Sequence, residues 1–283
     1  MHAYFFANYR LLTDEGIANH ESIKRQLAEF ETPMPYTHTF TLRLGDADEL
    51  EEKRAWALGY PVAYRVGSAT LHDTDDGWAF VSRQRWGGPR NVVLCSRDWG
   101  DIVAWLTDSI YDKYSIIHAC NMGMAMRDGL PLHAALVEKD GFGVVFLGTY
   151  GRGKSTQAKL WEKCLGAGII CDDMCIMRKI DGKWLGFGMP WDSPDTLTRQ
   201  TSVPVRALVK LEQAEENSIS PMTPVQALSV MLQQVRIPVW DNTAVDGAVP
   251  LMGRLVRDLP MVRLRCLPDE AAARLTYDTI RKE

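Results

Sequence analysis

Short runs of alternating apolar and polar residues dominate the first hundred residues of the chain. Residues 39–44 and 62–66 are two such runs, and Gly- and Asp-rich turns separate them. Runs of this kind predict short β-strands. Over residues 101–126 the apolar side chains recur instead at roughly helical spacing, until Gly129 and Pro131 interrupt the pattern. That spacing predicts one helix packed on the core.

A denser pattern of strands and helices follows. Two apolar runs, residues 132–137 and 143–147, flank the dipeptide Asp140-Gly141, and an Asp-Gly turn between such runs is a strong hairpin signal. The pattern then predicts a glycine-rich loop, a helix ending near residue 165, a strand over 168–171, a hairpin over 175–187, and helices over 223–235 and 268–281.

In the last of these helices, Pro268 suits the first helical position, and Asp269 and Glu270 suit the positive end of the helix dipole. Together these elements predict an α/β fold with a mixed sheet of the α+β kind. We expect a small β-rich N-terminal region over residues 1–100, with a possible role in acceptor recognition, and a second domain over residues 101–283.

Composition narrows the function classes. The 283-residue chain is 46% hydrophobic, and its 32 basic and 36 acidic residues give a net charge of −4. This balance predicts a globular protein with a sizeable core and disfavours disorder. It lacks the positive excess of a dedicated nucleic-acid binder, and no apolar run reaches the roughly 18 residues of a bilayer span. We therefore expect neither nucleic acid nor a membrane as a partner.

The six cysteines form no CxxC pairs and are too sparse for a disulfide scaffold. The first ten residues lack the basic segment and apolar stretch of an export signal. A cytoplasmic protein with reduced thiols is expected.

Residues 148–155 read Gly-Thr-Tyr-Gly-Arg-Gly-Lys-Ser and match the phosphate-binding pattern G-x-x-x-x-G-K-[ST] in full. A chance match in a chain of this length is about a 1% event, and the loop lies between an apolar strand and a helix. The alternative, a glycine-rich turn with no ligand, is disfavoured by that spacing and context. We therefore expect a nucleotide and Mg²⁺ as cofactors, and the motif leaves the choice between ATP and GTP open.

Each residue type in this loop has a physical role. Glycines let the backbone N–H groups turn towards an anion, and the helix N-terminus adds further donors. Lys154 would reach the β- and γ-phosphates, and the Ser155 hydroxyl would bind Mg²⁺. The residues expected to bind the nucleotide are Gly148, Gly151, Arg152, Gly153, Lys154, Ser155 and Thr156.

Two adjacent carboxylates follow the next apolar strand. Asp172 and Asp173 lie 17 and 18 residues after Ser155, and ligand sites in open α/β sheets form at such strand ends. One carboxylate could hold Mg²⁺ while the other accepts a proton from a nucleophile; a solvated turn is the alternative. His133, in the predicted strand before the loop, is either a core histidine or a functional side chain.

These residues, in this order, resemble the HPr kinase/phosphorylase family, whose wider superfamily includes phosphoenolpyruvate carboxykinase. The resemblance covers residues 130–195 and continues more loosely through 188–191, 211–213 and 216–217. The chain is similar in particular to family members that are found beside peptide-maturation enzymes. Several of these family members phosphorylate a serine in a precursor peptide. The glycine- and arginine-containing signature of true HPr kinases is absent, which disfavours HPr as the substrate.

The resemblance implies roles for the candidate residues. It puts the ATP phosphates on Gly151, Gly153 and Lys154 and Mg²⁺ on Ser155. It makes the aspartate pair the source of the catalytic base and a metal contact, with Asp172 as base and Asp173 at the metal, or the reverse. His133 would orient the base or contact the nucleotide. Arg199 and Arg206 are candidates for a lid over the transferring phosphoryl group.

We therefore expect an ATP- and Mg²⁺-dependent kinase that phosphorylates a hydroxyl, most simply a serine in a peptide or protein. Two alternatives remain open. One is a kinase for a small-molecule hydroxyl, and the other is a nucleotide-gated regulatory protein with little catalysis. The oligomeric state is left open as well.

Overall fold

The structure is a computed structural model that describes residues 1–21, 23–66, 69–82, 91–107, 112–190 and 198–282. Residues 191–195, the last part of the segment that resembles the HPr kinase/phosphorylase family, lie outside the described residues. The chain divides into two compact units. We call Met1–Arg127 with Pro238–Val245 the N-terminal unit, and Asp128–Ile237 with Asp246–Glu283 the P-loop unit. The N-terminal unit thus continues past residue 100.

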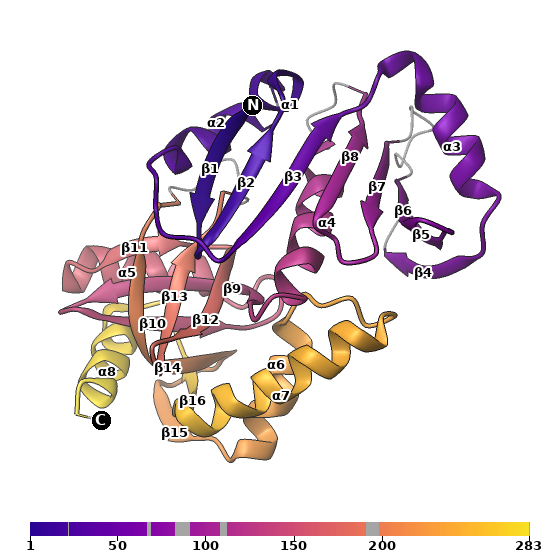
Figure 1. The fold of residues 1–283 in the computed structure, drawn as a ribbon. Coiled ribbons are helices and arrows are strands. Elements are labelled where there is room, and N and C mark those ends of the chain that lie inside the picture. The colour runs from indigo at the N-terminus through magenta and orange to yellow at the C-terminus, as the bar shows by residue number, and fades with distance from the viewer. Residues whose placement is uncertain (22, 67–68, 83–90, 108–111, 191–197, 283) are drawn as a thin grey trace. The chain divides into compact units, whose positions relative to one another are not determined.

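The N-terminal unit is built on one mixed sheet with the strand order β1-β2-β3-β8-β7-β6-β5-β4 (Figure 1). The β-rich N-terminal region predicted from the sequence is confirmed. The strands are β1 His2–Phe6, β2 Tyr9–Thr13, β3 His38–Leu44, β4 Val62–Val66, β5 Ala69–Asp73, β6 Gly77–Ser82, β7 Val92–Ser96 and β8 Asp101–Trp105, and the α-helices are α1 Glu15–Asn19, α2 Lys24–Leu27, α3 Leu50–Leu58 and α4 Asp112–Ala125.

The predicted helix over residues 101–126 is wrong in its first part. Residues 101–105 form strand β8, and the helix α4 covers Asp112–Ala125. Strand β8 pairs in parallel with β3 and antiparallel with β7, and its buried Ile102 and Ala104 alternate with more exposed residues. Pairing on both sides outweighs the local helical spacing because strand formation depends on its neighbours.

The P-loop unit confirms the predicted α/β class with a mixed sheet. Its strand order is β10-β9-β12-β13-β14-β16-β15, with β11 also paired to β9 and β10 also paired to β14. The strands are β9 Leu130–Lys139, β10 Phe142–Leu147, β11 Gly168–Cys171, β12 Met174–Ile180, β13 Lys183–Gly188, β14 Ser202–Gln213, β15 Ser218–Pro221 and β16 Met261–Cys266. The α-helices are α5 Lys154–Leu165, α6 Pro224–Gln234, α7 Asn242–Asp258, which belongs to this unit from Asp246 onward, and α8 Glu270–Ile280.

The two longest strands of this unit each serve two sets of partners. The first half of β9 pairs with β12 and the second half with β10 and β11. Strand β14 pairs first with β13 and then with β10 and β16. Both predicted hairpins, β9–β10 and β12–β13, are confirmed as antiparallel pairs.

Helix α5 is fixed against the sheet by aromatic packing. The fully buried Trp161 lies edge-on to Phe146 of β10 and to Tyr277 of α8, with ring centroids 5.6 and 5.9 Å apart. The helix ends, as the sequence predicts, at Gly166, whose φ of 66° is the left-handed conformation that glycine adopts without strain. This packing holds the N-terminus of α5 at the end of β10.

Helix α8 begins two residues later than expected, at Glu270. The carboxylate of Asp269 accepts a hydrogen bond from the Ala272 amide at 2.9 Å, so Asp269 is the N-cap. Pro268 therefore precedes the cap instead of occupying the first helical position. Among the helices of the described residues, none has both the length and the apolar character required to cross a membrane.

Helix α6 offers a direct test of how its start is stabilised. The Thr223 hydroxyl accepts from the Gln226 amide, while the Gln226 side chain accepts from the Thr223 amide at 3.0 Å. Replacing Thr223→Ala removes the first bond and is expected to lower the free energy of unfolding by about 1 kcal/mol. Urea unfolding followed by tryptophan fluorescence measures the change. The matched variant Thr223→Ser keeps the hydroxyl and should retain most of the stability; equal losses in both variants would contradict the role of the cap.

Candidate functional site

The glycine-rich loop joins the end of β10 to the start of α5, as the sequence predicts. Gly151 and Gly153 have φ values of 77° and 94°, a left-handed conformation that favours glycine. Gly153 is the N-cap of α5, so the free amides of the first helical turn follow it directly. The buried ammonium of Lys154 donates to the carbonyl oxygen of Gly148 at 3.0 Å. The lysine thus folds back across its own loop.

A cavity of about 500 Å³ opens beside this loop, a volume within the range of small-ligand sites. Most of the residues singled out from the sequence line it, whereas Gly148 and Asp172 are not among the lining residues. The lining consists of His133, Tyr150, Gly151, Arg152, Gly153, Lys154, Ser155, Thr156, Gln157, Asp173, Gln213, Cys266, Leu267 and Pro268.

Strand β9 brings the aspartate pair to the loop. Ala134 lies opposite Leu147, the last residue before the loop, and its amide donates to the carbonyl oxygen of Asp173 at 2.9 Å. The next residue back, His133, lies opposite Met174. One short stretch of β9 therefore sets the position of the P-loop and of Asp173 at the same time.

His133 and Asp173 form a side-chain pair on the cavity wall. The Nε2 atom of His133 lies 3.1 Å from Oδ1 of Asp173. The Asp173 side chain is 48% exposed, whereas Asp172 is 6% exposed. The Ser155 hydroxyl donates to the main-chain oxygen of Asp172 at 3.4 Å. Asp173 therefore faces the cavity beside the histidine, and the main chain of Asp172 lies beside Ser155.

The charges of the site influence one another. The hydrogen bond from His133 is the largest influence that lowers the pKa of Asp173, and the positive charges of Lys154 and Arg236 act in the same direction. Burial lowers the pKa of Lys154, while the negative charge of Asp173 opposes that shift. Asp173 is thus an ionised carboxylate at neutral pH, close to two cations.

Arg236 does not line the cavity, but its charge acts on Asp173 and Lys154, and the sequence does not indicate this. Its amide donates to the Pro131 oxygen at 2.8 Å, next to an isolated bridge between Val235 and Leu132. Burial lowers the pKa of the guanidinium, and Asp173 opposes that shift. Arg236 immediately follows the predicted helix 223–235, but no motif marks it, so only the fold reveals its proximity to Asp173 and Lys154.

The role of Gln234 was not predicted from the sequence either. The side chain is 1% exposed. With its amide nitrogen turned towards them, it donates to the carbonyl oxygens of His133 and Gly148, at 3.1 Å each. It thereby links β9 directly to the first residue of the loop.

The two arginines considered for a lid lie elsewhere. The Arg206 guanidinium packs over the Phe142 ring at 4.1 Å from the centroid. Phe142 starts the strand whose other end carries the loop, about 17 Å along at 3.3 to 3.4 Å per residue. Arg199 has an exposed side chain, and its amide donates to the Ile170 oxygen at 3.0 Å. Neither arginine lines the cavity.

The opposite wall of the cavity comes from the ends of β14 and β16. The Gln213 side chain donates to the Gly151 oxygen at 3.2 Å and steadies the loop. Cys266, Leu267 and Pro268 continue this wall.

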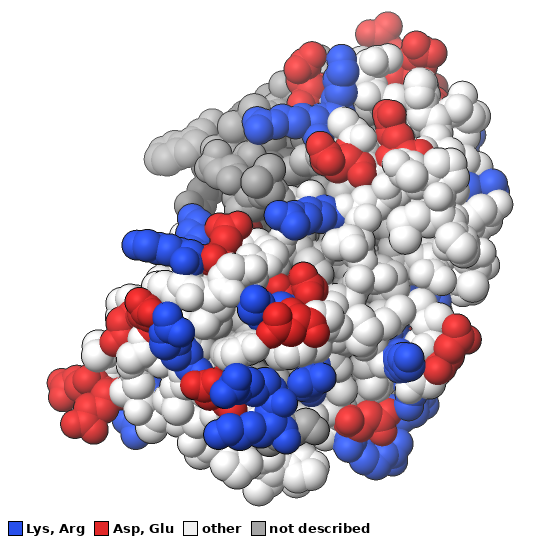
Figure 2. Space-filling view, turned by 90° about the vertical axis from the view of Figure 1, so that its left-hand side faces the viewer, with Lys and Arg blue, Asp and Glu red and all other residues white. Residues whose placement is uncertain are grey.

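On the molecular face drawn in Figure 2, Lys and Arg side chains occur in several groups with Asp and Glu close to them.

The donor set of the cavity fits the groups expected from the sequence. Backbone amides at a helix N-terminus together with an ammonium suit the phosphates of a nucleotide. Hydroxyl and carboxylate oxygens are the ligands that Mg²⁺ takes, alongside phosphate oxygens and water. Ser155 and Asp173, which both line the cavity, could supply these oxygens.

A comparison with protein-family models identifies the family. The model described as SynChlorMet cassette protein ScmC matches residues 108–254, just over half of the chain. The chain belongs to the ScmC family. The ScmC match includes the loop, the aspartate pair, His133 and Arg236, whereas the cavity wall from Cys266 to Pro268 lies beyond it.

Other comparisons add little to the ScmC assignment. No curated protein matches the chain. Among solved structures, the HPr(Ser) kinase/phosphatase from Coxiella burnetii is 13% identical, with a TM-score of 0.32 over 54% of this chain and 88% of that chain. A similarity at this level carries no argument about the present protein.

The pair on the cavity wall predicts a specific titration. Because the hydrogen bond from His133 lowers the pKa of Asp173, the stabilisation due to the ionised carboxylate is present above the ordinary aspartate range. It is lost as the pH falls through the lowered pKa. In His133→Ala the pKa of Asp173 should rise towards its ordinary value, as measured by an NMR titration of the Asp173 carboxyl carbon. The exposed Asp181 is the internal control, and an unchanged Asp173 midpoint would contradict the assigned cause.

Proposed function

We propose that this protein is an ATP- and Mg²⁺-dependent phosphotransferase that moves the γ-phosphoryl group to a hydroxyl, most simply a serine of a peptide or protein. One observation carries the proposal. The carboxylate of Asp173, paired with His133, faces the same cavity as Lys154 and Ser155 of the P-loop. A site that only held nucleotide would have no use for a proton acceptor there.

The loop supplies the binding half of the reaction. Its inward amides and Lys154 would hold the β- and γ-phosphates. The Ser155 hydroxyl would bind Mg²⁺, and the negative charge of the buried Asp172 nearby would favour the cation. The metal, when bound, neutralises charge on the phosphates. Lys154 would exchange its present bond to the Gly148 oxygen for phosphate oxygens, so its buried charge gains a stronger partner.

The aspartate pair supplies the chemical half. Asp173 would accept the proton of the acceptor hydroxyl, because it faces the cavity and His133 orients it. The hydroxyl oxygen then bonds to the γ-phosphorus, the bond from that phosphorus to the bridging oxygen breaks, and ADP leaves. This assigns the base to Asp173 and the metal side to Asp172, which is the reverse of the first of the two arrangements expected from the sequence.

Arg236 would stabilise the transferring phosphoryl group. Its charge acts on both Asp173 and Lys154, so an anion between those two side chains would also be within its electrostatic reach. Charge spread over the equatorial oxygens is what catalytic arginines stabilise in phosphoryl transfer. The choice of a serine acceptor follows the similarity to kinases that occur beside peptide-maturation enzymes.

The base assignment is tested by Asp173→Asn, which keeps the shape of the side chain and removes its basicity. Transfer of label from γ-labelled ATP to a serine-containing peptide library should fall by about 10²- to 10⁴-fold, while ATP binding, measured by calorimetry, should largely survive. Asp172→Asn should reduce transfer through the metal, and extra Mg²⁺ should restore part of it. The exposed turn variant Asp181→Asn is the matched control.

Two outcomes would contradict the proposal. Full transfer by Asp173→Asn would rule out the base, and ATP binding without transfer to any peptide or small hydroxyl would favour the nucleotide-gated regulatory protein. Label on a small molecule but on no peptide would keep the phosphotransferase and change its acceptor.

The role of Arg236 is tested separately. Arg236→Ala should lower the transfer rate by about 10³-fold, the low end of the effect of catalytic arginines, with a much smaller change in ATP affinity. Arg236→Lys keeps the charge without the planar fork and should recover only part of the rate. Arg206→Ala, at the far end of β10, serves as the control. A similar loss in Arg206→Ala would indicate a general effect on folding instead.

A further inference from the structure

A second cavity lies within the N-terminal unit, and the proposed phosphotransfer makes no use of it. Its volume is about 470 Å³. Helix α3 forms one wall, strands β6, β7 and β8 form the floor, and the β5–β6 turn contributes to the rim. The lining consists of Glu52, Lys53, Trp56, Thr74, Asp76, Gly77, Trp78, Leu94, Cys95, Ser96, Asp101 and Val103.

The strand register explains the mixed character of the floor. Leu94 of β7 lies opposite Val103 of β8. Ser96 and Asp101 are each two residues further along the same two strands, so their side chains lie on the same face of the sheet. The half-buried Leu94 and Val103 pack against the small core under α3. The floor thus passes from an apolar area to a polar area that ends in a carboxylate.

The charge of the cavity is negative. Three carboxylates line it, Glu52, Asp76 and Asp101, against the single ammonium of Lys53. That ammonium is already 3.6 Å from the Glu52 carboxylate and lies 5.9 Å from the Trp105 ring centroid. Asp76 and Asp101 are exposed to solvent, so their charges are available to a ligand.

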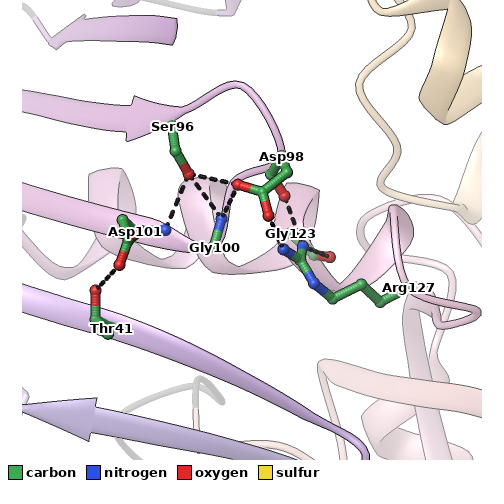
Figure 3. A network of polar contacts seen from close by, with 7 residues as sticks. All are labelled: Thr41, Ser96, Asp98, Gly100, Asp101, Gly123 and Arg127. Atoms are coloured by element: carbon green, nitrogen blue, oxygen red, sulfur yellow. Dashed lines mark hydrogen bonds and ion pairs between the residues drawn. The ribbon is translucent and has the colours of Figure 1, made fainter. Parts of the chain in front are cut away.

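Asp101 is held in place by its neighbours (Figure 3). The Thr41 hydroxyl donates to its Oδ1 at 2.5 Å. The Asp101 amide donates to the Ser96 hydroxyl oxygen at 3.0 Å, and that hydroxyl donates to Asp98 at 2.6 Å. Arg127 of the same unit bonds the Asp98 carboxylate in turn. A carboxylate fixed in this way loses little conformational entropy when it binds a cation.

Trp56 supplies an aromatic surface at the edge of the cavity. It is 37% exposed, which is a large apolar area to leave in water. An indole beside carboxylates suits a side chain with an apolar stem and a cationic head, because the stem packs on the ring and the head pairs with the acids.

We propose that this cavity binds an arginine or lysine side chain of the peptide that carries the acceptor hydroxyl. That the bound peptide is the phosphoryl acceptor rests on the proposed function. The binding of a cationic side chain in this cavity does not depend on it. The methylene stem packs against Trp56, Leu94 and Val103, and the charged head lies among the carboxylates of Asp76 and Asp101, with Glu52 adding to the negative field.

The test measures peptide binding to the full chain without nucleotide, by fluorescence anisotropy. The probes are a labelled serine-containing peptide with one arginine and the same peptide with citrulline, a neutral isostere, in its place. The arginine peptide should bind more tightly, and the preference should weaken as salt is added. Asp76→Asn combined with Asp101→Asn should weaken binding of the arginine peptide by about fivefold and leave the citrulline peptide nearly unchanged.

The controls separate this inference from folding and from catalysis. Glu21→Gln, an exposed acid of the same unit outside the cavity, should bind both peptides as the native chain does. Glu52→Gln, on the exposed side of α3, gives a second test if the double variant is unstable. Lys154→Ala should bind the peptide normally, so a failure of phosphotransfer leaves this measurement intact. Equal affinity for the arginine and citrulline peptides, or an unaffected double variant, would overturn the proposal.

Discussion

The candidate site depends on the antiparallel pairing of β9 with two neighbours at once. In most parallel α/β arrangements a crossover helix separates the phosphate-loop strand from the next strand in the sheet. Here a tight hairpin puts β9 directly beside β10, and β9 then continues into its pairing with β12. The loop and Asp173 are fixed by hydrogen bonds to adjacent residues of one strand, so small changes in β9 would move both together.

The pairing of β9 brings charged side chains together in a partly buried site. Lys154 and Arg236 are both desolvated, and their pKa values are lowered for that reason. Burying cations costs free energy unless a partner compensates for the lost water, and among the ionised groups close to both, Asp173 opposes each shift. In the proposed reaction, a phosphate group between the two cations would add further negative charge and offset part of this cost. Fixed charges placed where charge develops are what phosphoryl transfer requires.

The sequence predicted the parts of this site that depend on local pattern. The β9–β10 hairpin, the loop and the end of α5 follow from turn residues and glycines close to one another in the chain. Strand β8 was mistaken for helix because its apolar residues also fit a helical spacing, and neither the distant pairing with β3 nor the hairpin with the nearby β7 was predicted. Helix α7 was not predicted because Pro250 and two glycines interrupt it, although Ala244, Ala248 and Leu251 form a buried stripe. Arg236 could not be found because its contribution exists only through tertiary placement.

The two proposals give the two cavities opposite electrostatic preferences, and that difference bears on specificity. A serine hydroxyl presents little surface for recognition, so a kinase that selects one serine must take binding energy from other parts of the substrate. In the proposed reaction, the P-loop cavity would bind anions through its amides and Lys154, with the charge of Arg236 nearby. The cavity beneath α3 would favour cations through Asp76 and Asp101, so it would repel the nucleotide phosphates. A basic peptide segment and ATP would then occupy separate sites without competing, and each could be selected by charge alone.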